Sequence, residues 1–102
     1  MSYYDRQGNP IDMTTWANMA EDMTLKRVAS TDLAKVWVST VWLGLDHAFM
    51  DGPPLIFETM IFKRDGAEID WCEEYAERYS TEAAALAGHD RAVAWAKAQG
   101  FG

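Results

Sequence analysis

The chain has 102 residues, of which 49% are hydrophobic, and its formal net charge is −7. This hydrophobic content excludes a disordered chain, and the length suits one domain, residues 1–102, with a single core. The acidic balance disfavours nucleic-acid binding, because phosphate backbones repel such a chain. Apolar runs too short to cross a bilayer, no recognisable signal peptide and a single cysteine, Cys72, together predict a protein of a reducing cytoplasm.

The first thirty residues predict small elements at the margin of the fold. A turn signal, Gln-Gly-Asn-Pro at 7–10, follows a possible short strand. Thr14 or Thr15 is expected to cap a short helix that ends at about residue 22. Residues 25–30 then predict an edge strand, because their apolar content is low and two basic residues would protect an open edge.

The centre of the chain predicts an antiparallel hairpin, with strands over 36–45 and 55–62. Both segments are rich in β-branched and aromatic residues, and turn formers bound them. If Leu45 lies opposite Leu55, the register places Glu58 opposite Trp42. Neither face of this hairpin is polar enough to face water, so we expect helices on one face and a helix or a second subunit on the other.

A third strand is predicted after the hairpin. The pair Asp65-Gly66 predicts a tight turn, since glycine accepts the positive φ that such a turn requires. The spacing of Trp71, Tyr75 and Tyr79 also fits a helix, but the preceding turn favours a strand over 68–80.

The last segment predicts a helix over 81–98 with Ser80 as its cap. Its expected inner face consists of Ala85, Leu86, His89, Ala92, Val93 and Ala96. The predicted fold is therefore α+β: an antiparallel sheet of three to four strands, with a C-terminal helix and a short N-terminal helix packed on it.

Glu58 is a charged residue in the middle of an apolar strand. A buried charge without a partner is very costly. We therefore expect Glu58 either to have a structural role, in which it reaches a strand edge or pairs with Arg78 as a bridge, or to act as a ligand-binding or catalytic carboxylate.

The two histidines have different settings. His89 lies on the apolar stripe of the last helix, which favours a hydrogen-bonded core residue. His47 follows Asp46 directly after the central strand. Together with Glu58 these residues would offer imidazole and carboxylate ligands to a metal, but no spacing typical of a metal motif is present. No cofactor is expected, and no motif of nucleophilic catalysis occurs.

A binding pocket is predicted at one end of the sheet. Asp46 and His47 lie on the loop after the central strand, and loops held by a rigid sheet are common binding positions. Arg78 and Tyr79 directly precede the last helix, where a cation beside helix-start N–H groups would suit an anion. The candidate ligand-binding residues are Asp46, His47, Glu58, Arg78, Tyr79 and His89.

Several segments resemble a family of small proteins encoded by bacteriophages and prophages. They are YDRQGNPI (4–11), STVWLGLDH (39–47), PPLIFETM (53–60), RYST (78–81) and AGH (87–89). The resemblance implies an accessory protein made in a bacterial cytoplasm, and it assigns no chemistry to any residue.

Three functions stay open from the sequence. The first is an accessory protein that acts by binding, and that modulates or counters a host system through a host protein or a small nucleotide-like ligand. The second is a small hydrolase, with or without a metal, that uses Asp46, His47, Glu58 and His89. The third is a self-assembling structural protein. Surplus apolar surface on the second sheet face predicts a homo-oligomer.

Overall fold

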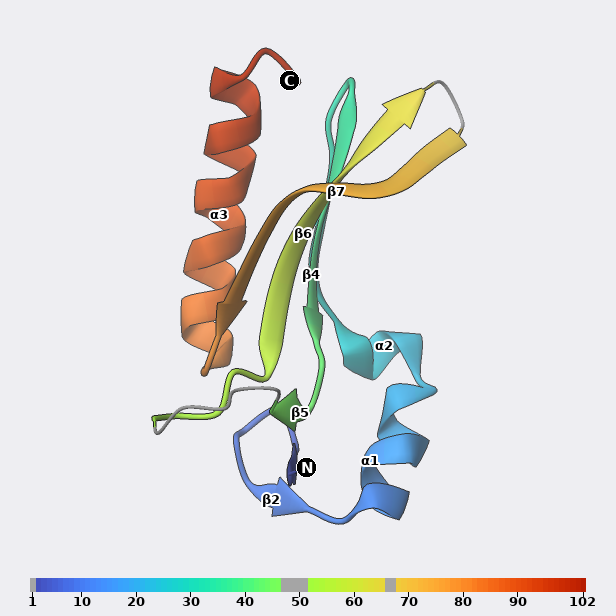
Figure 1. Cartoon of the computed structure of the whole chain (residues 1–102), viewed down its shortest axis with the longest axis vertical. Helices are drawn as coiled ribbons and strands as arrows, with labels where there is room; N and C mark the ends of the chain where they lie inside the picture. Colours follow the sequence, from blue (N-terminus) through green and yellow to red (C-terminus); the bar gives the residue numbers. More distant parts are fainter. Residues whose placement is uncertain (1, 47–51, 66–67) are drawn as a thin grey trace.

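The structure, a computed structural model, describes residues 2–46, 52–65 and 68–102 (Figure 1). In chain order, its elements are β1 (Ser2–Tyr4), β2 (Pro10–Ile11), α1 (Met13–Ala20), α2 (Met23–Lys26), β3 (Arg27–Asp32), β4 (Val36–Trp42), β5 (Leu45–Asp46), β6 (Phe57–Asp65), β7 (Glu68–Tyr79) and α3 (Glu82–Ala98).

The strands form two antiparallel sheets. The larger has the order β3-β4-β6-β7, and the smaller has the order β2-β1-β5. In Figure 1, α3 lies to the left of the larger sheet, and α1 and α2 lie to the right of its strands, near the smaller sheet. The predicted α+β class, with a C-terminal helix and a short N-terminal helix on an antiparallel sheet, is confirmed.

The N-terminal turn forms where the sequence predicts it. The Asp5 carboxylate accepts hydrogen bonds from the backbone N–H groups of Gln7, at 3.0 Å, and Asn9, at 2.8 Å. Gly8 takes a φ of +86°, which a residue without a side chain adopts at little cost. This turn joins β1 to β2 and so places the small sheet at the end of the molecule.

The central hairpin forms, but its predicted register is wrong by one residue. β4 pairs with β6 so that Trp42 lies opposite Phe57 instead of Glu58. A shift of one residue moves every side chain of a strand to the other face of the sheet. The observed register places Ile61 opposite Val38, so apolar side chains meet beneath α3 and Glu58 lies on the opposite face.

The first strand of that hairpin ends three residues earlier than predicted. The backbone N–H groups of Leu43 and Gly44 both donate to the Ile56 carbonyl, at 2.7 and 3.3 Å, which interrupts the regular ladder. Gly44 has a φ of +70°, and a Cβ there would overlap the side chains of Trp42 and Trp16. The chain therefore leaves the larger sheet here and enters the smaller one as β5.

The two outer strands of the larger sheet largely follow the prediction. β3 lies at an edge, but it begins at Arg27 because residues 23–26 form α2, which Asp22 caps. β7 is one continuous strand, so the helical alternative for residues 71–79 is wrong. Asp65 pairs with Glu68, which fits a two-residue turn, although the turn residues 66–67 lie outside the described residues.

The caps of the first and last helices differ from the predicted ones. Asp12, and not Thr14 or Thr15, caps α1 by accepting the backbone N–H three residues further on at 2.7 Å. Thr81, and not Ser80, caps α3 in the same way at 3.1 Å. In both cases the side-chain oxygen that reaches the third following N–H defines the start of the helix.

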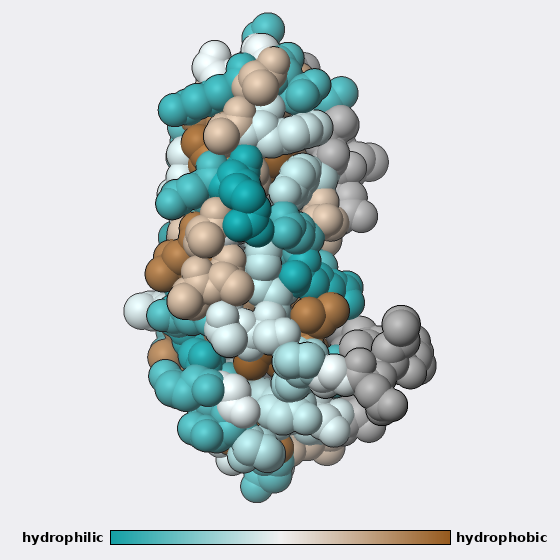
Figure 2. All heavy atoms as spheres, turned by 90° about the vertical axis from the view of Figure 1, so that its left-hand side faces the viewer, coloured by the Kyte–Doolittle hydropathy of each residue, from teal (hydrophilic) through white to brown (hydrophobic). Residues whose placement is uncertain are grey.

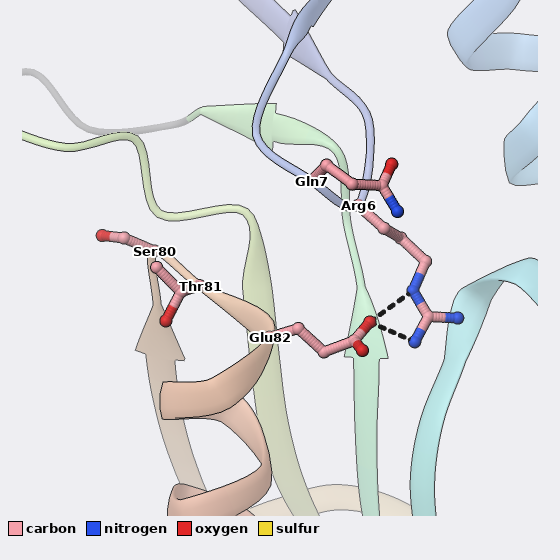
Figure 3. Close-up of a pocket in the computed structure, with 5 residues that line it drawn as sticks. All are labelled: Arg6, Gln7, Ser80, Thr81 and Glu82. Atoms are coloured by element: carbon pink, nitrogen blue, oxygen red, sulfur yellow. Dashed lines mark hydrogen bonds and ion pairs between the residues drawn. The ribbon is translucent and has the colours of Figure 1, made fainter.

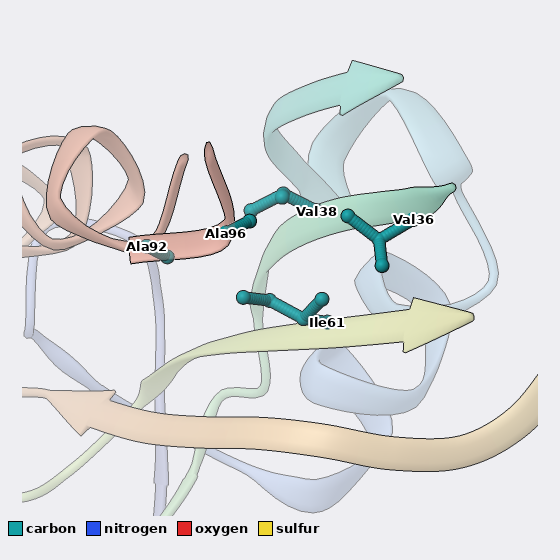
Figure 4. Packing of buried hydrophobic residues seen from close by; sticks show 5 residues of the cluster. All are labelled: Val36, Val38, Ile61, Ala92 and Ala96. Carbon is teal, nitrogen blue, oxygen red and sulfur yellow. The ribbon is translucent and has the colours of Figure 1, made fainter. Parts of the chain in front are cut away.

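The main core lies between α3 and the middle strands of the larger sheet (Figure 4). Alanines on the helix meet branched side chains from β4 and β6, and burial of each Val or Ile contributes about 2 kcal/mol. Small helix side chains allow α3 to lie close to the strands. The fully buried members of this cluster are Val36, Val38, Ile61, Ala92 and Ala96.

A second core cluster joins the larger sheet to the N-terminal elements. Fully buried Trp42 packs at its centre, and Trp16 of α1 packs against the cluster. The two indole N–H groups also bind backbone oxygens: that of Trp42 donates to Tyr4 at 3.2 Å, and that of Trp16 donates to Leu43 at 2.9 Å. The two sheets therefore share one packed junction.

The outward side of α3 mixes polar and apolar residues, as Figure 2 shows from that side of the molecule. Leu86, predicted on the inner face of the helix, is exposed. The helix instead turns its smallest residues and one histidine toward the sheet: Ala85, Gly88, His89, Ala92 and Ala96.

Candidate functional site

Glu58 and Arg78 form an ion pair on the face of the larger sheet that points away from α3. They lie directly opposite each other on β6 and β7, and Arg78 Nε is 2.8 Å from Glu58 Oε2. Glu58 is only 6% exposed, whereas the Arg78 side chain is 41% exposed. The guanidinium neutralises the buried carboxylate, so the prediction of a structural bridge is confirmed.

The same face carries aromatic and apolar side chains around this pair. We call it the outer face; by strand alternation it comprises Trp37, Ser39, Val41, Glu58, Met60, Phe62 and Arg78. The rings of Trp37 and Phe62 lie 5.5 Å apart, and the Trp37 indole N–H donates to Ser30 Oγ at 2.8 Å. Trp37, Val41 and Met60 are half-buried, so each presents some apolar surface outward.

The opposite, inner face carries a buried polar chain centred on His89. The imidazole is 5% exposed; its Nε2 lies 2.8 Å from Thr31 Oγ1 and its Nδ1 lies 2.7 Å from Thr40 Oγ1. Thr40 Oγ1 also shares a hydrogen bond with Thr59 Oγ1. Burial lowers the pKa of His89 below its usual value. The prediction of a hydrogen-bonded core histidine is confirmed.

Tyr79 lies on the inner face and packs against Gly88 of α3. A Cβ at Gly88 would overlap the Tyr79 ring, so this glycine permits the close approach of helix and strand. Within the described part of the chain the Tyr79 hydroxyl is buried and makes no hydrogen bond of normal geometry. Burial raises the pKa of this phenol, which keeps it neutral.

A polar cluster on the surface also connects β7 to α3. Glu77 accepts a hydrogen bond from the Tyr75 hydroxyl at 2.7 Å and from Arg91 Nη2 at 3.0 Å. The Tyr75 hydrogen bond is the main cause that lowers the pKa of Glu77, and burial raises the pKa of Tyr75 to about 12. The Glu77 carboxylate therefore stays ionised beside the helix, where Arg91 balances its charge.

The predicted site residues do not meet at one place. Glu58 and Arg78 lie on the outer face, whereas Tyr79 and His89 lie beneath α3. Asp46 belongs to β5 of the smaller sheet, opposite Ser2. His47 falls outside the described residues. A ligand-binding role for these residues stays a prediction, but the described ones occupy three separate places.

A cleft that the sequence did not predict lies where the N-terminal turn meets the start of α3 (Figure 3). It has a volume of about 320 Å³. Arg6 crosses it to Glu82: the guanidinium Nε lies 2.7 Å from Glu82 Oε1, and Nη2 binds the same oxygen. The lining residues are Arg6, Gln7, Ser80, Thr81 and Glu82. In the sequence, the only indication of this cleft was Glu82, the acidic residue in the first turn of α3.

A second hollow borders the edge strand β3. It has a volume of about 490 Å³, and it runs from the start of α2 along the first residues of the strand. Met23 is 60% exposed at its rim. The lining residues are Met23, Thr24, Arg27, Val28, Ala29 and Ser30. The sequence predicted the edge strand but not the hollow, because the hollow requires α2 to pack beside it.

Among the described residues, no three His, Cys, Asp or Glu side chains lie close enough together to hold a metal ion. Within the same ranges, no helix combines the length and the apolar character needed to cross a bilayer.

Comparisons with known proteins give no relative for this chain. No family model matches the sequence, and no curated protein or solved structure matches it.

Proposed function

We propose that this protein is a bacteriophage accessory protein that acts by binding a bacterial host protein in the cytoplasm, and that thereby modulates or counters a host system. The observation that carries the proposal is the composition of the outer face. Trp, Met and Arg are enriched in the cores of protein interfaces, and the partly exposed Trp37, Met60 and Arg78 share this face. Phe62 is buried against Trp37 and supports its ring.

The chemistry of the buried groups supports binding over catalysis. Both ring nitrogens of His89 are engaged by threonine hydroxyls, and Glu58 is engaged by Arg78. A hydrolase that used these side chains would first have to break buried hydrogen bonds, each of which costs about 1 kcal/mol or more to lose. A small anionic ligand has less support, because Glu82 already occupies the cation in the cleft beside α3.

The test places a bulky charge at the centre of the outer face. Ser39 lies opposite Met60, and Ser39→Arg adds a long cation there without removing any core side chain. The matched control is Leu86→Arg, which adds the same cation to the exposed side of α3. A photo-crosslinking amino acid at position 60 identifies the host protein in living bacteria, and titration calorimetry then measures its affinity for each purified variant.

We expect Ser39→Arg to weaken binding at least about tenfold, or about 1.4 kcal/mol, and Leu86→Arg to leave it unchanged. Thermal unfolding checks that both variants remain folded. Equal loss of affinity in both variants, or none in either, would contradict the proposed surface.

A further inference from the structure

β3 is the edge strand of the larger sheet, and the described residues place β4 on one side of it and no strand on the other. We propose that a second copy of this chain pairs with that edge, β3 against β3 and antiparallel, so that two four-stranded sheets become one continuous sheet. This inference is independent of the outer-face proposal, because it uses the edge of the sheet and not its face.

The backbone of β3 offers hydrogen-bonding groups to such a partner. The β3–β4 turn closes where the Leu33 N–H donates to the Val36 carbonyl at 2.9 Å. In an antiparallel ladder, alternate residues direct both backbone groups toward the same neighbour. Thr31 and Ala29 therefore point toward β4 as Leu33 does, while the N–H and C=O groups of Ser30 and Asp32 point away from the sheet.

The charges on β3 are complementary to those of a second copy. Exposed Arg27 begins the strand, and Asp32 ends it. One Asp32 carboxylate oxygen binds Arg64 of the same chain, but the side chain is still 68% exposed and can accept a second cation. Arg27 lies opposite Val41 and Asp32 opposite Trp37, so both side chains belong to the side of the outer face. Antiparallel pairing about a two-fold axis at Ser30 places Asp32 opposite position 28 of the other copy. Because Val28 is the extra residue of a bulge, Arg27 takes that position and lies beside Asp32 of the other copy.

This register also has an advantage over the alternatives. A parallel pairing would place Arg27 of one copy beside Arg27 of the other. Like charges opposite each other destabilise a sheet. Charged residues at an edge normally oppose association with other strands. Here Arg27 and Asp32 disfavour the other registers by repulsion and favour the antiparallel register centred on Ser30. Repulsion in the wrong arrangements thus makes the pairing specific.

The hollow beside β3 gives the incoming strand a place to lie. It borders residues 27–30, which include the centre of the proposed two-fold axis. Exposed Met23 at its rim would lose contact with water when the partner strand lies there. The bulge at Val28 ends the regular ladder, so the shared ladder is short and the dimer is expected to dissociate on dilution.

Charge exchange tests the register directly. Sedimentation equilibrium of the full chain, from low to high micromolar concentration, measures dimer formation by the wild type, by Arg27→Asp and by Asp32→Arg. We expect each single variant to weaken the dimer at least tenfold. An equal mixture of the two should recover it, because one chain then presents only acidic groups at the ends of β3 and the other only basic ones.

A proline provides the second measurement. Ser30→Pro removes an N–H that points away from β4, so the intramolecular ladder survives while the dimer is lost. Ser30→Ala is the control, because both variants lose the hydroxyl that binds Trp37 but only proline removes the N–H. Thermal unfolding shows whether each variant is folded.

A wild type that stays monomeric throughout would overturn the inference. So would a folded Ser30→Pro variant that dimerises as strongly as the wild type, or a mixture of folded charge variants that stays monomeric. A dimer that Ser39→Arg disrupts and Ser30→Pro leaves intact would place the contact on the outer face instead. Loss of host-protein binding with an unchanged dimer would bear on the outer-face proposal alone.

Discussion

At the scale of single residues, His89 is the group whose protonation the fold controls most clearly. Its ring is surrounded by threonine hydroxyls beneath α3, and both nitrogens are already within hydrogen-bond distance of an oxygen. A neutral imidazole satisfies this arrangement with one donor and one acceptor nitrogen. Within residues 2–46, 52–65 and 68–102, no ion pair of this ring is found, so a charged imidazole would remain buried without a counter-ion in contact. Asp90, next to it in the chain, partly favours the charged form.

The stability of the protein should therefore depend on pH through His89. Because the folded pKa lies below the ordinary value of 6.5, the unfolded chain binds more protons in mild acid. The stability that the neutral, buried His89 ring contributes is fully present above pH 6.5, and it is lost as the pH falls from there through the folded pKa. Urea unfolding at several pH values measures how the free energy of unfolding changes with pH. This slope should be steeper in the wild type than in His89→Gln by up to about 1.4 kcal/mol per pH unit.

The comparison of slopes separates titration from packing. His89→Gln also loses part of the hydrogen-bonded chain, so the variant is expected to be less stable at every pH. A slope between pH 6.5 and 5 that is the same in both proteins would show that His89 does not control this dependence.

The sequence predicted whether single residues are buried better than it predicted their hydrogen-bond partners. The position of His89 on an apolar helical stripe indicated a core residue, and the isolation of Glu58 among apolar residues indicated a need for Arg78. The threonine partners of His89 were not predicted. They lie on β3 and β4, and only the correct strand register and helix docking bring them under the ring.

At the scale of elements, the contact of α3 with β7 depends on Gly88. Glycine in the middle of a helix ordinarily costs about 1 kcal/mol relative to alanine. Here a methyl group would overlap the Tyr79 ring, so the helix would have to move away from the sheet. Gly88 therefore destabilises the helix locally but permits its close packing against Tyr79.

Gly88→Ala should lower the free energy of unfolding by about 1–3 kcal/mol, because overpacking outweighs the gain in helix propensity. In a Tyr79→Ala background the obstacle is absent, and the same change should stabilise the protein by a few tenths of a kcal/mol to about 1 kcal/mol. Urea unfolding of the four proteins measures the coupling. If Gly88→Ala stabilises the wild-type background as well, the packing argument fails.

The elements that the sequence predicted well are those with strong local signals. The turn at residues 7–10, the strand after Asp65-Gly66 and the long last helix all formed as expected. The register of the central hairpin was wrong because its loop is long, so no tight turn fixes which residues lie opposite each other. The departure of the chain at Gly44 depends on Trp16 and Trp42, which are distant in sequence.

At the scale of the whole molecule, Arg6 connects the N-terminal elements to the rest. Besides Glu82 of α3, its guanidinium binds the Leu25 carbonyl at the end of α2 at 3.2 Å. One side chain therefore contacts the segment before β3 and the start of the last helix. The small sheet has few backbone pairs of its own, so this contact is expected to hold it in place.

Arg6→Gln should lower the free energy of unfolding by only about 1 kcal/mol, because the ion pair is partly exposed. Its main effect should be local: amide hydrogen exchange in residues 2–11 should accelerate, while that of β4 and β6 is unchanged. Arg64→Gln is the matched control, since it removes an ion pair with Asp32 that does not involve the N-terminal turn. Equal exchange at residues 2–11 in both variants would contradict this role.

The two proposed contacts are compatible in one assembly. Pairing of β3 with a second copy leaves the outer faces of both sheets accessible on the same side, since strands in a continuous sheet keep their faces aligned. A dimer would then present two equivalent surfaces to host proteins, and binding of a multivalent target would gain avidity from their linkage.

The position of α3 after all the strands it covers has a consequence for biosynthesis. The ribosome completes β3, β4, β6 and β7 before it makes the helix that buries Val38 and Ile61. Strands that pair at that stage would form a sheet whose apolar side has no cover. Such a chain would be a substrate for chaperones, and a fragment that terminates before α3 would be prone to aggregate.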